Sequence, residues 1–162
     1  MDGDILASGG MSSEKRKVFI FDLDDTLYQN DAQGQLINTV NRDLLEKLPG
    51  IRIVFSNANY NHCILWLNKL GITDLMTAII SCDIIQGYKP HNIIYHRLMS
   101  ICNINLEECD VIFFDDLICN LETAHALGWQ VVYIPPFNLN IENATENIFS
   151  NINAAITKYT QN

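Results

Sequence analysis

The chain has 162 residues, 48% of them hydrophobic, which is enough apolar material for one globular core. Its 19 acidic and 10 basic residues give a formal net charge of -9, and this balance argues against a protein that grips nucleic acid polymers through their phosphates. A small phosphorylated substrate stays compatible with the charge.

The chain shows no membrane segment, because no run approaches the ~20 apolar residues that a bilayer-spanning helix needs. Residues 1–11 lack the basic and apolar regions of a secretory signal, so we expect a disordered leader there and a single domain over residues 12–162. The five cysteines include no CxxC pair. This pattern favours a reduced, cytoplasmic protein.

The first predicted element is an apolar strand over residues 17–22 that stops abruptly at a polar cluster. Such a run is typical of a parallel sheet covered on both faces, and these sheets bind ligands beyond the carboxyl ends of their strands. The cluster contains three carboxylates and a hydroxyl: Asp22, Asp24, Asp25 and Thr26. Carboxylates this close repel one another, so the cluster predicts a bound cation, and hard oxygen ligands favour Mg²⁺.

Strands and helices alternate along the rest of the chain, as judged from apolar spacing and from Gly or Pro at element ends. The expected elements are, in order, a hairpin or flap over 28–35, a helix over 36–48, a strand over 51–55, a helix over 61–70, a strand over 78–82, a helix over 93–101, a strand over 110–114, a helix over 120–127, a strand over 131–134 and a helix over 142–159. This alternation predicts a doubly wound parallel sheet, an α/β Rossmann-like fold.

Further polar groups stand at or beside the ends of these elements, where the loops of an open α/β sheet can converge. They are Ser56 and Asn57, Lys89, Asp115 and Asp116, and Asn120. Together with DLDDTLY, the segments FSNAN, Lys-Pro and FFDDLICN resemble the motifs of the haloacid dehalogenase (HAD) superfamily of phosphohydrolases. The motifs occur in the matching order over residues 17–136, and the resemblance implies a three-layer α/β/α core.

The resemblance also implies roles for the acids. Asp22 would attack phosphorus and form an aspartyl-phosphate, and Asp24 would act as general acid and base. Mg²⁺ would be held by Asp22, by the backbone carbonyl of Asp24 and by a carboxylate of the Asp115–Asp116 pair. Alignment with the Gly-Asp pair usual in the superfamily favours Asp116 as the direct ligand, with Asp115 in support.

The remaining polar residues would serve the phosphate and the surroundings of the metal. Phosphoryl oxygens carry charge throughout the reaction and need fixed donors, which the resemblance assigns to Thr26, Ser56, Asn57 and Lys89. Asn120 would hydrogen-bond within the outer shell of the metal.

Each assignment has a structural alternative. Asp25 and Asp115 can act as turn or cap residues, and Ser56, Asn57 and Asn120 can cap helices. His62 is interpreted mainly as an ordinary helix residue and Tyr28 mainly as a packing residue. Tyr28 nevertheless follows the acid cluster closely enough to touch a substrate, and His62 could line the mouth of the pocket.

Two features bear on the reaction and the substrate. Dehalogenases of the superfamily lack the second acid, so the presence of Asp24 favours hydrolysis of phosphate esters. The motifs look most similar to the pyrimidine 5′-nucleotidase-like branch, yet the intervals from Thr26 to Ser56 and on to Lys89 are too short for the branch's helical cap. We therefore expect a capless enzyme that acts on nucleotides or other small phosphorylated metabolites, in which a homo-oligomer could supply a surrogate cap. The rivals are a capless phosphoprotein phosphatase and a catalytically idle HAD-fold binding protein.

Overall fold

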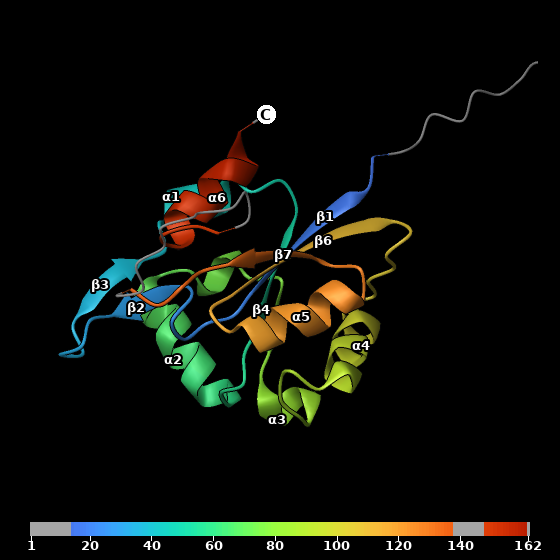
Figure 1. Ribbon diagram of the computed structural model, residues 1–162, viewed down its shortest axis with the longest axis horizontal. Helices are drawn as coiled ribbons and strands as arrows, with labels where there is room; N and C mark the ends of the chain where they lie inside the picture. Colours follow the sequence, from blue (N-terminus) through green and yellow to red (C-terminus); the bar gives the residue numbers. More distant parts are fainter. Residues whose placement is uncertain (1–13, 138–147, 162) are drawn as a thin grey trace, which may run out of the picture.

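The computed structural model describes residues 14–137 and 148–161, so the leader expected at residues 1–11 lies outside the described residues. Its centre is a parallel sheet in the order β5-β4-β1-β6-β7 with helices on both faces (Figure 1). The strands are β1 (Arg16–Phe21), β4 (Ile51–Phe55), β5 (Ala78–Ile80), β6 (Cys109–Asp115) and β7 (Gln130–Tyr133). The predicted doubly wound α/β fold is confirmed.

The two faces of β1 supply two separate hydrophobic layers, because successive side chains of a strand point in opposite directions. Phe19 and Phe21 belong to one core cluster, and Val18 and Ile20 belong to the other. The first cluster lies under α1 (Arg42–Glu46), α2 (Tyr60–Leu70) and α6 (Ile152–Thr160). The second lies under α3 (Cys82–Ile85), α4 (Asn92–Ile101) and α5 (Ile118–Ala126). Burial on both faces explains why β1 reads as a continuous apolar run rather than an alternating one.

A hairpin follows β1, as the sequence predicts, but it is longer than expected. Its strands β2 (Tyr28–Asn30) and β3 (Leu36–Thr39) pair antiparallel and project from the central sheet (Figure 1). The helix predicted over residues 36–48 is therefore wrong in its first part. Leu36 continues the helical spacing of Val40 and Leu44, yet pairing with β2 satisfies the backbone of residues 36–39. The helix α1 begins only after Asn41, which accepts a hydrogen bond from the amide of Leu44.

The last predicted helix is also shorter than expected. Of residues 142–159, the part up to 147 lies outside the described residues, and residues 148–151 are not helical. Asn151 caps α6 by accepting a hydrogen bond from the amide of Ala154 at 3.1 Å. Two short elements have no counterpart among the predicted ones: a 3₁₀ turn at Thr73–Leu75 and α3.

No cap domain is inserted between the site motifs. The interval between Thr26 and Ser56, all of it described, holds only the hairpin, α1 and β4, and the interval to Lys89 holds α2, the 3₁₀ turn, β5 and α3. The expectation that these two intervals are too short for a cap is confirmed. In the described parts of the chain, no helix has the length and apolar character required to span a bilayer.

Candidate active site

The central sheet brings three motifs to one edge. Phe21 at the end of β1 is in register with Val54 of β4 and with Phe114 of β6, so the residues that follow these strands become neighbours. The amide of Asp22 donates to the carbonyl of Phe114 at 2.9 Å, which ties the start of the acid cluster to β6. The backbone pairing thus brings these motifs together at the carboxyl ends of the strands, as the sequence predicts.

Lys89 reaches the middle of this edge as a buried cation. Its Nζ donates to Asp22 Oδ1 at 3.0 Å, to Asp115 Oδ2 at 2.9 Å and to the carbonyl of Phe55 at 2.7 Å. Only 4% of the residue is exposed. Burial by itself would lower the pKa of Lys89, but the two carboxylates outweigh it and raise the pKa, so the side chain carries a fixed positive charge.

Asp115 is fully engaged by the protein itself. Its Oδ1 accepts a hydrogen bond from the amide of Leu117 at 2.8 Å, and its Oδ2 accepts from Asn120 Nδ2 at 3.1 Å in addition to Lys89. Asn120 lies inside the first turn of α5, whose cap position is Leu117, so the alternative that Asn120 caps this helix is wrong. Its side chain instead fixes the carboxylate of Asp115.

The carboxylate of Asp116 differs from that of Asp115, because it faces the other acids with little positive charge or hydrogen bonding to offset their repulsion. The hydroxyl of Thr26 lies 3.2 Å from Asp22 Oδ2 and 3.3 Å from Asp116 Oδ1, so one hydrogen is shared between two carboxylates. The pKa of Asp116 is raised to about 9. Burial is the largest cause, and the hydrogen bond to Asp22 and repulsion from Asp22 and Asp115 add to it. In the absence of a cation, Asp116 thus keeps a proton at neutral pH.

The donor set fits a divalent cation. One oxygen each from Asp22, Asp115 and Asp116 lie within 4.8 Å of one another. When all three are ionised, Lys89 neutralises only one of three negative charges, which leaves a surplus of two on a set of hard oxygen ligands. Such a set suits Mg²⁺ in ligand type and in charge.

Asp24 makes contacts that the sequence analysis missed. Its Oδ1 accepts a hydrogen bond from the hydroxyl of Tyr28 and lies 2.8 Å from Nε2 of His62. His62 is three residues past Asn59, whose side chain caps α2 by accepting from the amide of His62 at 2.9 Å. An Asn cap followed by His in the first helical turn is the sequence signal that could have placed this ring near the site, because α2 starts at the loop that carries Ser56.

The loop after β4 is shaped by its own side chains. Ser56, only 2% exposed, accepts a hydrogen bond from the amide of Ala58 at 3.0 Å through its hydroxyl oxygen. Asn57 bonds the backbone of Lys89 twice, accepting from its amide at 2.8 Å and donating to its carbonyl at 3.1 Å. Asn57 therefore anchors the segment that carries Lys89. Phosphate contacts of Thr26, Ser56 and Asn57 stay predictions.

Asp25 forms the turn out of the acid cluster. Its φ of 64° lies in the left-handed region, which Asp tolerates better than most residues with a side chain, and its own side chain is exposed. Burial of part of the carboxyl and repulsion from Asp24 raise its pKa. The structural alternative given for Asp25 is consistent with this conformation.

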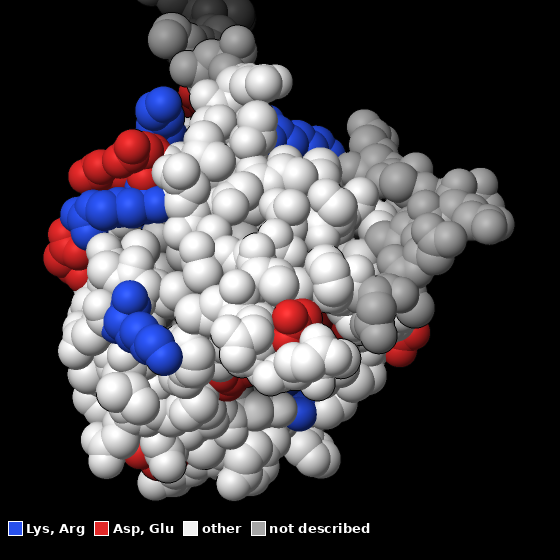
Figure 2. Space-filling view, turned by 90° about the vertical axis from the view of Figure 1, so that its left-hand side faces the viewer, with Lys and Arg blue, Asp and Glu red and all other residues white. Residues whose placement is uncertain are grey.

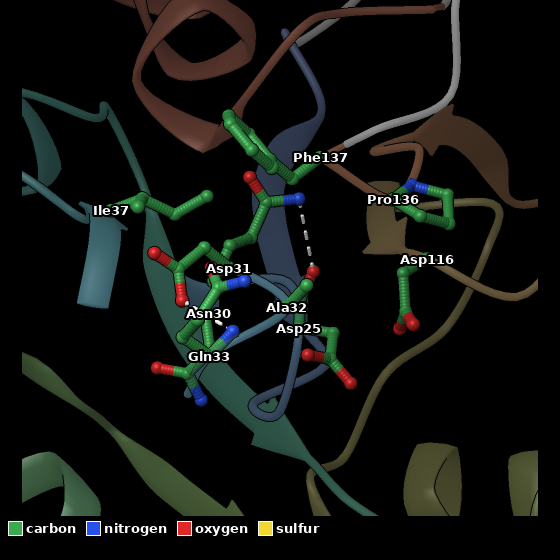
Figure 3. A pocket seen from close by; sticks show the side chains of 10 residues that line it. Asp25, Asn30, Asp31, Ala32, Gln33, Ile37, Asp116, Pro136 and Phe137 are labelled. Atoms are coloured by element: carbon green, nitrogen blue, oxygen red, sulfur yellow. Dashed lines mark hydrogen bonds between the residues drawn. The ribbon is translucent and has the colours of Figure 1, made fainter. Parts of the chain in front are cut away.

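A pocket of about 540 Å³ opens beside Asp116. The hairpin forms one side of it, and Asp116 with Pro136 forms the other (Figure 3). Gln29, 3% exposed, connects the two sides by donating to the carbonyl of Pro135 at 3.0 Å and accepting from Asn38 at 2.9 Å. The end of the molecule where the hairpin projects is mostly uncharged, with scattered rather than clustered Lys and Arg (Figure 2).

Comparison with known proteins identifies relatives by sequence family and by fold. A family model for haloacid dehalogenase-like hydrolases matches residues 35–134. No curated protein matches significantly.

Solved structures share the fold at low sequence identity. A HAD-family enzyme from Bacteroides thetaiotaomicron, crystallised as an aspartate-to-alanine variant with magnesium and inorganic phosphate, is 15% identical with a TM-score of 0.63, and the match covers 79% of this chain and 98% of that one. A HAD-like hydrolase from Porphyromonas gingivalis is 14% identical with a TM-score of 0.61, over 78% and 94% of the two chains. L-2-haloacid dehalogenase from Xanthobacter autotrophicus is 24% identical with a TM-score of 0.54 over 62% of this chain, which spans only 40% of the dehalogenase.

Proposed function

Because the chain belongs to the haloacid dehalogenase-like hydrolase family, we propose that it hydrolyses phosphate monoesters through an aspartyl-phosphate on Asp22, with Mg²⁺ as cofactor. The observation that carries the proposal is the pairing of two acids at the end of β1. Asp22 is held by Lys89, while Asp24, two residues on, is held apart from that network by Tyr28 and His62. A second acid in this position serves a leaving oxygen that needs a proton, whereas a halide leaving group needs none.

Mg²⁺ would be held by Asp22 and Asp116 together with the backbone carbonyl of Asp24. Asp115 and Asn120 would support the site from the side, since Asp115 is already engaged by Lys89, Asn120 and the Leu117 amide. When bound, Mg²⁺ would stabilise the charge on the phosphoryl oxygens.

The residues of the chain divide the remaining chemistry. The Asp22 carboxylate attacks phosphorus, the ester bond to the leaving oxygen breaks, and Asp24 gives that oxygen its proton. Water then attacks the phosphorus of the aspartyl-phosphate and passes a proton to Asp24. The bond between the Asp22 oxygen and phosphorus breaks and inorganic phosphate leaves, which restores both acids. Thr26 and the Ser56 hydroxyl would donate to the phosphoryl oxygens. Lys89 would offset the charge of these oxygens, because its three N–H groups already bond Asp22, Asp115 and the Phe55 carbonyl. Asn57 would contribute through its backbone amide, because its side chain is engaged.

The test compares Asp22→Asn with Asp110→Asn, a substitution of the same kind near the opposite end of β6. With p-nitrophenyl phosphate and Mg²⁺, we expect the first variant to lose turnover while its circular dichroism spectrum is retained, and the second to keep wild-type turnover. Magnesium-dependent turnover in Asp22→Asn equal to that of the wild type would refute the aspartyl-phosphate. Failure of the folded wild type to hydrolyse any monoester would favour the idle binding protein.

We propose nucleotides or other small phosphorylated metabolites, and a homo-oligomer in which a second subunit excludes water where a cap is absent. Two observations favour a phosphoprotein as the second candidate. No cap is inserted between Thr26 and Lys89, an interval that the structure describes throughout, and Tyr88 and Leu117, the immediate neighbours of Lys89 and Asp116, are 58% and 50% exposed. A screen of nucleotides, sugar phosphates and phosphopeptides, with light scattering for the oligomeric state, separates these possibilities.

A further inference from the structure

The hydrogen bonds to Asp24 are one-sided. The hydroxyl of Tyr28 and Nε2 of His62 both contact Oδ1, and no donor among residues 14–137 and 148–161 contacts Oδ2. An Oδ1 oxygen that accepts from two donors cannot also carry a proton without displacing one of them. The arrangement therefore distinguishes the two oxygens of a carboxyl group that would otherwise be equivalent.

Both donors are anchored by the same helix. The Asn59 cap fixes the backbone of His62 in the first turn of α2, and Trp66 lies four residues further on, which places it on the same helix face. Trp66 stacks on the ring of Tyr28 with centroids 3.9 Å apart and planes 6° from parallel. Tyr28 itself is only 4% exposed. One face of α2 thus holds Asp24 directly through His62 and indirectly through Tyr28.

From this geometry we propose that His62 and Tyr28 are positioning residues that hold Asp24 by Oδ1, so that Oδ2 carries the proton exchanged with the leaving oxygen and with water. The inference rests on the proposed function, because it assigns the orientation of the acid in that reaction. Neither residue touches the reacting atoms in this scheme.

The proton balance follows the two half-reactions. In the first, the Oδ2–H bond of Asp24 breaks as the leaving oxygen takes the proton, and the new carboxylate charge is stabilised by both donors at Oδ1. In the second, the attacking water loses a proton to Oδ2, and Asp24 returns to its starting state. Proton exchange is confined to Oδ2 of Asp24 in this scheme, and His62 acts only through its contact with Oδ1.

The kinetic test uses two phosphate esters, only one of which needs a general acid to protonate its leaving group. p-Nitrophenolate leaves readily, whereas the alkoxide of glycerol phosphate must be protonated as it leaves. We expect His62→Ala to lower kcat/KM for glycerol phosphate about tenfold more than for p-nitrophenyl phosphate. This difference is smaller than the ~10²–10⁴-fold that general acid catalysis contributes, because Asp24 itself remains. Tyr28→Phe, which keeps the ring that stacks on Trp66, should act in the same direction.

Controls separate positioning from damage to the fold. His62→Gln retains an amide donor and should restore most of the ratio between the two esters, and His96→Ala, an exposed histidine on α4, should leave the ratio at its wild-type value. In Asp24→Asn, adding His62→Ala should have no further effect. An equal loss with both esters in His62→Ala would show a structural role and overturn the proposal, whereas a wild type inactive on both esters would overturn the proposed function instead.

A measurement on the metal-free protein needs no turnover. The ¹⁵N chemical shifts of the His62 ring, at a pH where the ring is neutral, should place its proton on Nε2, the nitrogen that faces Asp24. The Asp24→Ala variant should shift the ring toward a mixture of tautomers. A wild-type ring with its proton on Nδ1, or one unaffected by Asp24→Ala, would overturn the proposed hydrogen bond.

Discussion

Replacement of Lys89 by Met should destabilise the metal-free protein more than any change of a surface lysine. Met has a similar length but no charge, so the variant leaves the carboxylates of Asp22 and Asp115 and the carbonyl of Phe55 without the donor that lies 2.7–3.0 Å away. Removing one partner from a buried ion pair costs ~3–5 kcal/mol of unfolding free energy. For a domain of this size that corresponds to a fall in melting temperature of roughly 6–20 °C.

The loss should depend on pH in a defined direction. Burial and repulsion from Asp22 raise the pKa of Asp115 even though Lys89 opposes the shift, and without Lys89 the rise is larger. An acid whose pKa is higher in the folded than in the unfolded state binds its proton more tightly when folded, so acidification stabilises the fold. The penalty in Lys89→Met should therefore be complete at pH well above the folded pKa of Asp115 and should shrink as the pH falls toward ~4, the ordinary value for Asp.

The assay is urea denaturation in the presence of a chelator at several pH values, with Lys47→Met, an exposed lysine at the end of α1, as the matched control. A stability of Lys89→Met within ~1 kcal/mol of the control, the value expected of exposed pairs, would refute the reasoning. So would a deficit that does not change with pH.

Three further predictions concern the metal site and the packing at the opposite end of β1. Mg²⁺ binding at pH 7 should release about one proton, and its affinity should increase as the pH rises toward 9, because the pKa of Asp116 is raised to about 9. Calorimetry in two buffers measures the number of protons released, and Asp116→Asn should release none. Asn120→Ala should weaken Mg²⁺ binding ~10- to 100-fold by releasing Asp115, and unchanged affinity in a titration would contradict that role. Gly50→Ala should cost ~1–3 kcal/mol or more in urea denaturation, since an added Cβ would lie 2.2 Å from the carbonyl oxygen of Lys17; a wild-type midpoint would contradict this clash.

Much of the fold could be predicted from local pattern. Apolar runs in β1 and β6 indicate burial on both faces of a sheet. Glycine is typical of a helix end, and α2 ends at Gly71 in the left-handed conformation. The helix predicted from residue 36 failed for a physical reason. Residues 36–39 could continue a helix or form a strand, and pairing with β2 across the turn makes them a strand.

The sequence by itself determined the chemistry that is available: an acid cluster at the end of a buried strand, a lysine and a second acid pair, in an order that places them at one edge of a sheet. The tertiary structure decided how these groups divide their work. It set Asp115 against Lys89 and Asn120, left Asp116 facing Asp22, and joined Asp24 to His62 and Tyr28. Hydrogen bonds between residues 38 or 90 positions apart depend on where the fold places α2 and the end of β6 relative to the end of β1, and the spacing of residues along the chain does not encode that placement.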